Sequence, residues 1–161
     1  MKISARIIAT ALLIPFLIHT HTVHAEGWYF GAKAGPVVLD LPSLDDPVNA
    51  GIVLGHDWGV VIGDLGIEAE ATTTVANGKG DGSGVDVKTG GLFAAVRSAG
   101  PIYVKGRLGY AVYDFTGASG QSESNFAYGL AFGVSVGIVK FELEYTQMDS
   151  DVNMMTFGVL F

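Results

Sequence analysis

Apolar and polar side chains alternate along most of the chain beyond residue 26. The pattern is clearest from Leu65 to Val75, where Leu, Ile, Ala, Thr and Val at odd positions alternate with Gly, Glu and Thr at even positions. Successive side chains of a strand point to opposite faces, so a period of two predicts one apolar and one polar face. The pattern predicts eight strands, at about 28–38, 51–60, 65–75, 87–97, 102–113, 125–136, 139–146 and 152–161.

The connections between these segments alternate between short and long. Tight turns are predicted at 62–63, 99–100 and 137–138, and longer polar, acidic connections at 39–50, 76–86, 114–124 and 147–151. Segments joined by tight turns form antiparallel hairpins. The chain is therefore expected to be all-β, with antiparallel strands in a simple up-and-down order.

Turn length fixes which residues of a hairpin share a face. Residues that flank a two-residue turn pair directly and point the same way. Around 137–138 the rule agrees with the alternation, because Val136 and Val139 both fall on the apolar face. In the segment 87–97 the alternation is ambiguous. A two-residue turn at 99–100 then predicts that Phe93 and Ala95 lie on the apolar face.

The polar faces of the predicted strands carry charges that an apolar core would not tolerate. The charged positions are Lys33, Glu68, Glu70, Lys105, Arg107, Lys140, Glu142 and Glu144. Burying such groups unpaired is very unfavourable, and exposing the opposite faces to water would leave a larger apolar band than monomers tolerate. Both problems disappear if the apolar faces contact lipid and the charges fill the interior. We therefore predict an eight-stranded antiparallel up-and-down transmembrane β-barrel.

The predicted interior charges fall into two layers. Glu68, Lys105 and Glu142 each lie about three residues beyond the start of their strands. Glu70, Arg107 and Glu144 lie one inward position further, and Lys33 is expected beside them. Because these three strands run in the same direction, the layers should stack into a mutually neutralising lumen charge network. The alternative is that each charge lies on a strand face in contact with water.

The first 25 residues have the layout of a secretory signal peptide. Lys2 and Arg6 give a basic start, and residues 7–18 form an apolar run. That run is shorter than the roughly twenty residues that a membrane-spanning helix needs, and small or apolar residues follow it. We expect a signal peptide at 1–25, cleavage before Glu26, and a barrel domain at 26–161.

The expected mature chain of 136 residues has seven basic and sixteen acidic residues, a formal charge of −9. An acidic chain is unsuited to binding nucleic acid. The sequence contains no cysteine, so stability must come from burial and strand pairing rather than from disulfides.

The final segment places Phe161, Val159 and Phe157 on one apolar face. An exposed apolar strand edge invites aggregation, whereas in a closed barrel the last strand pairs with the first and no edge remains. Trp28 and Trp58 lie near strand ends, as aromatic residues do at a membrane interface.

Taken together, the chain resembles the small eight-stranded outer-membrane β-barrels of the OmpA/OmpX type, related to opacity-type porin-family barrels. The resemblance rests on the segments 27–31, 66–70, 103–109, 141–145 and 157–161. It implies export to a Gram-negative cell outer membrane and contact with outer-membrane lipid and lipopolysaccharide. It also implies that Phe161, Val159 and Phe157 form part of an assembly signal read by the barrel-assembly machinery. In such barrels a glutamate of the third strand joins a lumen salt-bridge network, and Glu68 occupies the matching place.

Little else in the sequence points to chemistry. His56 is the one histidine of the expected mature chain, and no Ser/His/acid arrangement or ligand spacing surrounds it. Residues 77–84 with Asp86 are similar to a calcium loop but lack a Glu at EF-hand spacing. We expect no catalytic site, metal or cofactor.

The leading hypothesis is a non-enzymatic, monomeric integral outer-membrane protein, structural and surface-exposed, with a charge-plugged lumen. The alternatives are a small outer-membrane channel or porin, a surface adhesin and, less favoured, a lipid-modifying outer-membrane enzyme.

Overall fold

The structure, a computed structural model, describes residues 26–39, 46–77, 86–116 and 121–161. These residues form eight antiparallel strands in a closed barrel, with each strand beside its neighbours in the chain. The strands are β1 (Gly27–Leu39), β2 (Val48–Val60), β3 (Gly63–Ala76), β4 (Asp86–Ser98), β5 (Ile102–Thr116), β6 (Gln121–Val136), β7 (Val139–Gln147) and β8 (Val152–Leu160). Pairing of β8 with β1 closes the barrel. The predicted all-β, up-and-down barrel is confirmed.

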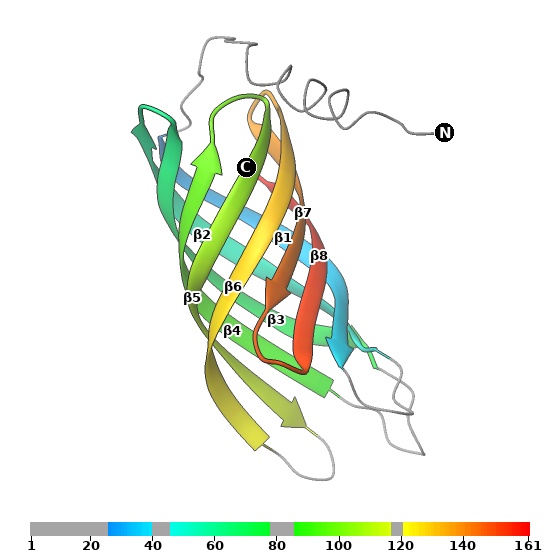
Figure 1. Ribbon diagram of the computed structural model, residues 1–161. Coiled ribbons are helices and arrows are strands. Elements are labelled where there is room, and N and C mark those ends of the chain that lie inside the picture. Colours follow the sequence, from blue (N-terminus) through cyan, green and yellow to red (C-terminus); the bar gives the residue numbers. More distant parts are fainter. Residues whose placement is uncertain (1–25, 40–45, 78–85, 117–120) are drawn as a thin grey trace, which may run out of the picture.

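The two ends of the barrel differ (Figure 1). The tight connections β2–β3, β4–β5 and β6–β7 lie at one end, which we call the turn end. At the opposite end, the loop end, β1, β3, β5 and β7 end and β2, β4, β6 and β8 begin. There β5 and β6 continue as a hairpin through the region predicted to be a loop, with Asp114 paired to Ser122. The described chain starts at Glu26 and ends at Phe161 on the turn-end side, and the expected signal peptide falls outside the described residues.

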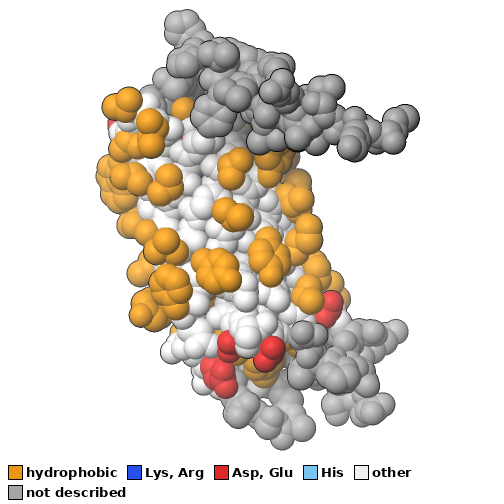
Figure 2. Space-filling model, in the orientation of Figure 1, with side chains coloured by type: hydrophobic (Ala, Val, Ile, Leu, Met, Phe, Trp, Pro, Cys, Tyr) orange, Lys and Arg blue, Asp and Glu red, His pale blue; other side chains and the backbone are white. Residues whose placement is uncertain are grey.

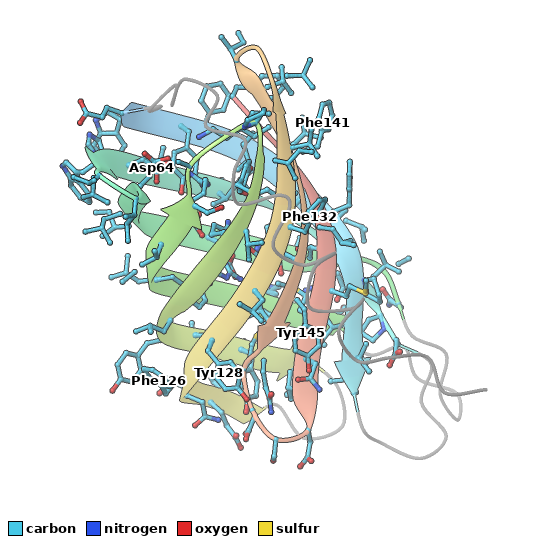
Figure 3. The ribbon with its side chains drawn as sticks, turned by 45° about the horizontal axis from the view of Figure 1, so that its top comes forward. Asp64, Phe126, Tyr128, Phe132, Phe141 and Tyr145 are labelled. Carbon is cyan, nitrogen blue, oxygen red and sulfur yellow. The ribbon has the colours of Figure 1, made fainter. Side chains whose placement is uncertain are left out.

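The strand faces separate by polarity as the alternation predicts. On β3, Leu65 and Ile67 are 45% and 46% exposed, whereas Glu68 and Glu70 are buried. Hydrophobic side chains cover the visible barrel wall, and acidic side chains gather towards the loop end (Figure 2). Phe126, Tyr128, Phe132, Phe141 and Tyr145 point away from the barrel axis (Figure 3). The usual arrangement of a soluble barrel is therefore inverted. No helix long and apolar enough to span a membrane occurs within the described ranges.

An apolar cluster fills the interior towards the loop end. Its members come from β1, β4, β5, β6, β8 and the β7–β8 connection, which contributes Met148. They are Val37, Leu39, Val87, Phe93, Ala111, Tyr113, Ala127, Met148, Val152 and Met154. Side chains of this size fill an eight-stranded interior. The interior therefore has an apolar part at the loop end and a charged part between it and the turn end.

The predicted orientation of β4 is wrong. Phe93 and Ala95 are 1% and 4% exposed and point inward, whereas Leu92 and Val96 point outward. The cause is the β4–β5 turn, which has an odd number of residues, since Arg97 pairs with Lys105. The Ser98 hydroxyl accepts a hydrogen bond from the Val104 N–H at 3.1 Å across this longer turn. One additional turn residue reverses the face of every side chain in the strand.

Candidate functional site

The interior of the barrel gathers five bases and six acids within the described ranges. They are Lys33 on β1, Asp57 on β2, Asp64, Glu68 and Glu70 on β3, Arg97 on β4, Lys105 and Arg107 on β5, and Lys140, Glu142 and Glu144 on β7. All seven members of the predicted charge network belong to this group. The group is close to neutral, which lowers the cost of enclosing so many charges.

One layer of the charges lies towards the loop end. The Lys33 Nζ donates to Glu70 at 2.5 Å and to Glu144 at 2.6 Å. The Arg107 guanidinium contacts the same two carboxylates, at 2.6 Å for Glu70 and 2.8 Å for Glu144. Arg107 also donates to the Thr146 hydroxyl at 2.6 Å. Two bases therefore alternate with two acids in a compact group.

A second layer lies nearer the turn end. The Lys105 Nζ lies 2.9 Å from Glu68 and 2.6 Å from Glu142. Two tyrosine hydroxyls also donate hydrogen bonds to these carboxylates. Tyr29 donates to Glu68 at 2.6 Å and Tyr103 donates to Glu142 at 2.8 Å. Lys105 also lies 3.2 Å from Glu144 of the first layer. The two layers are thus joined into one network.

A third group, closest to the turn end, lies outside the predicted network, although Lys140 was predicted to face inward. Arg97 forms a salt bridge with Asp57, and its guanidinium lies 3.5 Å from Glu142. Lys140 lies 3.5 Å from Asp57. Arg97 was missed because of the incorrect orientation of β4. Asp57 could have been found, because the alternation of β2 places it on the polar face beside Gly55 and Gly59.

Aromatic rings hold the arginines in place. The Arg97 guanidinium carbon lies 5.4 Å from the ring centre of Tyr29 and 5.1 Å from that of Tyr103, distances at which a cation is attracted to a ring face. Each tyrosine lies over a glycine of a neighbouring strand. A Cβ at Gly55 would come within 2.2 Å of the Tyr29 ring, and a Cβ at Gly133 within 2.2 Å of the Tyr103 ring. These two glycines therefore give the rings room to lie across the interior.

The remaining predicted residues lie on the outside or at the closing seam. Trp28 and Trp58 are 71% and 48% exposed near the turn end, with the His56 ring between them at 5.0 Å and 4.6 Å. The Phe161 N–H donates to the Phe30 carbonyl at 2.8 Å. Phe157 is 54% exposed, and Val159 pairs with Ala32 on the same outward face. His56 therefore lies among aromatic rings and away from the interior charges.

The loop end carries a smaller polar cluster. Asn125 donates to Asp149 at 2.8 Å, and the Tyr113 hydroxyl lies 2.8 Å from Asp149 and 2.9 Å from Glu123. Hydrogen bonds from the Ser150 backbone N–H and from Tyr113 hold the pKa of Asp149 below its usual range. No group of three or more potential metal ligands converges among the residues that the structure describes. Residues 78–85 of the candidate calcium loop lie outside them.

Comparison with known proteins adds structural neighbours only. No family model and no curated protein matches the sequence. The barrel is similar to Neisserial surface protein A, at 15% identity and a TM-score of 0.57, over 84% of this chain and 96% of that one. It is also similar to Ail, the attachment invasion locus protein of Yersinia pestis, at 18% identity and a TM-score of 0.54 over the same shares. A structure of Ail in complex with the heparin analogue sucrose octasulfate matches at 20% identity and a TM-score of 0.51, again over 84% and 96%.

At these identities the likeness establishes the fold. The chain has the fold of the small eight-stranded outer-membrane β-barrels, the class that its sequence resembles.

Proposed function

We propose that this protein is a non-enzymatic integral barrel of a Gram-negative outer membrane, with a closed lumen and an acidic loop end facing the cell exterior. The observation that carries the proposal is the inverted barrel. Its outward side chains are apolar around the wall, while its charges are buried inside and paired with one another. Such a surface is stable in lipid and unfavourable in water.

The filled interior supports a closed lumen. The side chains of Glu68, Lys105 and Arg107 are each no more than 2% exposed. The apolar cluster around Phe93 and Met148 fills the interior between these charges and the loop end. Eight-stranded barrels leave room for side chains and little else. A small channel is the second candidate, favoured only by the polar character of the charged layers.

The charge distribution bears on the adhesin alternative. Among the basic residues that the structure describes, only Lys88 lies outside the interior, because Lys33, Arg97, Lys105, Arg107 and Lys140 face inward. At the loop end the described acids, among them Asp114, Asp149 and Asp151, therefore outnumber the described bases. Ail has been crystallised with a heparin analogue. A strongly acidic end repels polyanions, so we do not extend that ligand to this chain.

The position of His56 supports a non-enzymatic role. Its ring lies between Trp28 and Trp58 on the outer wall, and its Nδ1 has no hydrogen-bond partner among the residues that the structure describes. Hydrolysis or acyl transfer requires a nucleophile and a base in contact. Mass analysis of lipid A from cells with and without the protein distinguishes the enzyme alternative. An altered acylation or headgroup pattern would favour the enzyme.

Assembly through the last strand completes the proposal. Phe161 is bonded to Phe30 through both backbone groups, at 2.8 Å and 3.1 Å, and its ring lies 5.9 Å from the Phe30 ring. The C-terminal strand therefore forms the closing seam with β1. A strand at this position is suited to recognition by the barrel-assembly machinery before it pairs with β1 and the barrel closes.

The proposal is tested by outer-membrane fractionation combined with gel mobility before and after heating. We expect the protein in the outer-membrane fraction, with a mobility that changes on heating as the barrel unfolds. Planar-bilayer recordings of the same preparation should show almost no conductance. Recovery in the soluble periplasmic fraction would contradict the membrane proposal, and a steady conductance would favour the channel.

A further inference from the structure

An apolar hollow lies on the outer wall of the barrel, where β5, β6, β7 and β8 are neighbours. Its volume of about 310 Å³ is at the lower end of the range for small-molecule sites. Outward side chains from these four strands line it, namely Val104, Leu130, Phe132, Leu143, Tyr145 and Met155. Glu144 also borders the hollow, but its carboxylate lies inside the barrel on Lys33 and Arg107. The hollow therefore presents an apolar surface to whatever fills it.

The row of outward residues next to the hollow, on its loop-end side, is polar. Gln147 of β7 pairs with Tyr128 of β6 and with Asn153 of β8. This row is one outward position beyond Leu130 and Tyr145, which pair with each other in the lining of the hollow. Tyr128 and Tyr145 point away from the barrel axis on the same side of the wall (Figure 3). The hollow is thus bounded towards the loop end by a row that we call the amide rim, made of Tyr128, Gln147 and Asn153.

Tyrosine hydroxyls hold the two amides of the rim. Tyr128 donates to the Gln147 Oε1 at 2.6 Å, and Tyr145 donates to the Asn153 Oδ1 at 2.9 Å. The NH2 groups of Gln147 and Asn153 donate to no residue that the structure describes. An amide donor on a lipid-facing wall is unfavourable unless an acceptor reaches it. The rim therefore favours a ligand that carries hydrogen-bond acceptors directly beside an apolar part.

The acceptor that fits this rim is uncharged. Among the described bases only Lys88 lies outside the interior, and it is on β4, which does not neighbour β6, β7 or β8. A phosphate would therefore find no basic partner at the rim. A carbonyl oxygen is an ordinary acceptor for an amide N–H. The ester or amide carbonyl that joins an acyl chain to a lipid headgroup lies next to the chain, as the rim lies next to the hollow.

We infer that the hollow and the amide rim form a binding site for one acyl chain of lipid A, the lipid part of lipopolysaccharide. The chain would lie against Leu130 and Leu143, and its linkage carbonyl would accept from Gln147 and Asn153. This inference rests on the proposed function, because a loop end that faces the cell exterior places the rim in the outer leaflet, which lipopolysaccharide forms. Phospholipids have the same linkage but fill the inner leaflet, at the turn end. Other lipids exchange freely along the wall, whereas this molecule is held at one place.

The experiment is non-denaturing mass spectrometry of the full chain, purified from outer membranes in a mild detergent. We expect the wild type to retain one lipid A molecule. Gln147→Met combined with Asn153→Leu removes both NH2 groups at nearly constant volume and should weaken retention about tenfold, the effect of two lost hydrogen bonds. Thr73→Val is the control, because Thr73 is an outward polar residue of β3, which lies away from the hollow. This control should retain lipid A as the wild type does.

A second pair of variants tests the hollow itself and leaves the amides unchanged. Leu130→Trp fills the hollow and should also reduce retention of lipid A. Leu92→Trp, at a similarly exposed residue of β4, should not reduce it. Gel mobility before and after heating shows whether each variant is folded.

The outcomes separate this inference from the proposed function. A wild-type barrel that is found in the outer membrane but retains no lipid, or retains phospholipid in place of lipid A, overturns the inference and leaves the membrane proposal standing. Unchanged retention in both the double variant and Leu130→Trp also overturns it, because the bound lipid would then lie elsewhere on the wall. Absence of the protein from the outer membrane contradicts the proposed function and this inference together.

Discussion

At the scale of single residues, neighbours decide whether a charge inside the barrel stabilises or destabilises it. Arg107 contacts Glu70 and Glu144, donates to Thr146, and lies over the Phe93 ring at 4.0 Å. Replacing one member leaves its partners buried without compensation, which typically costs about 3–5 kcal/mol. Replacing a matched acid and base together removes both the attraction and the uncompensated charge. The stability contributed by the network is therefore a property of pairs.

The first prediction is that Arg107→Met and Glu70→Gln are strongly non-additive. In reversible folding into bilayers, the destabilisation of the double variant should be smaller than the summed destabilisations of the two single variants. The difference, the coupling free energy, should be roughly 0.5–3 kcal/mol. Methionine retains part of the packing on Phe93. Arg107→Met with Leu65→Ala is the control pair, because Leu65 points outward on β3 and should add independently. Additivity in both pairs would mean that the interior charges do not interact.

The second prediction tests the corrected orientation of β4. Phe93→Ala should destabilise the barrel by about 3–5 kcal/mol, because it opens a cavity in the apolar cluster at the loop end. Leu92→Ala, one residue away but 63% exposed on the outer wall, should cost much less because lipid fills the space. Both are measured by the same equilibrium folding assay. A larger effect at Leu92 than at Phe93 would restore the orientation predicted from a two-residue turn.

At the scale of elements, alternation predicts strands well and turn geometry less well. The strong period of two in β3, β5 and β8 predicted where these strands begin and end to within a few residues. It also predicted which of their side chains point outward. β4 contains Thr89, Gly90, Gly91, Ala94 and Ala95, small residues that fit either face. The predicted orientation of β4 therefore depended on the length of the β4–β5 turn. The residues around Pro101 and Ile102 do not show where the paired part of the hairpin ends, so the turn length could not be predicted from them. The loop-end hairpin was missed because polar strands outside lipid need no apolar face.

The third prediction concerns the outward faces at different depths. Leu143→Arg, near the middle of β7, should destabilise the barrel in bilayers by about 2–4 kcal/mol. Ser122→Arg is also on an outer face, but it lies in the β5–β6 hairpin at the loop end and should cost about 0–1 kcal/mol. Unfolding titrations of the two variants check the difference. Equal costs would argue against a lipid-embedded wall.

The fourth prediction concerns the last strand. Deleting Phe161, or replacing it with Asp, should reduce the amount of folded protein in the outer membrane while leaving export intact, because the residue forms the seam with Phe30. Val61→Asp is the matched control, since Val61 is an exposed apolar residue in the β2–β3 turn. Quantitative blotting of membrane and periplasmic fractions measures the result. Normal outer-membrane levels without Phe161 would show that the terminal residue is dispensable.

At the scale of the whole molecule, the bases are concentrated inside the barrel, where they pair with acids, and the surplus acids lie mostly at the loop end. Five of the six described bases neutralise acids inside, which leaves the loop end strongly acidic. The sequence predicts most of this arrangement, because strand parity assigns the interior charges. It does not reveal the pairings themselves, which depend on the stagger between distant strands. With these charges inside and apolar side chains on the outer wall, the barrel has the opposite arrangement to that of a soluble barrel, and its interior is filled.

The most direct test of this account is nitroxide scanning of single cysteines along β6 in lipid bilayers, which the absence of native cysteine makes possible. Labels at the outward positions Tyr128, Leu130 and Phe132 should collide with oxygen dissolved in lipid and not with a water-soluble nickel complex. Labels at the inward positions Ala127 and Ala131 should be immobile and inaccessible to both. A period of two with inaccessible inward positions is the predicted result. Inward labels open to the nickel complex would contradict the closed lumen, and outward labels open to it would contradict the lipid-facing wall.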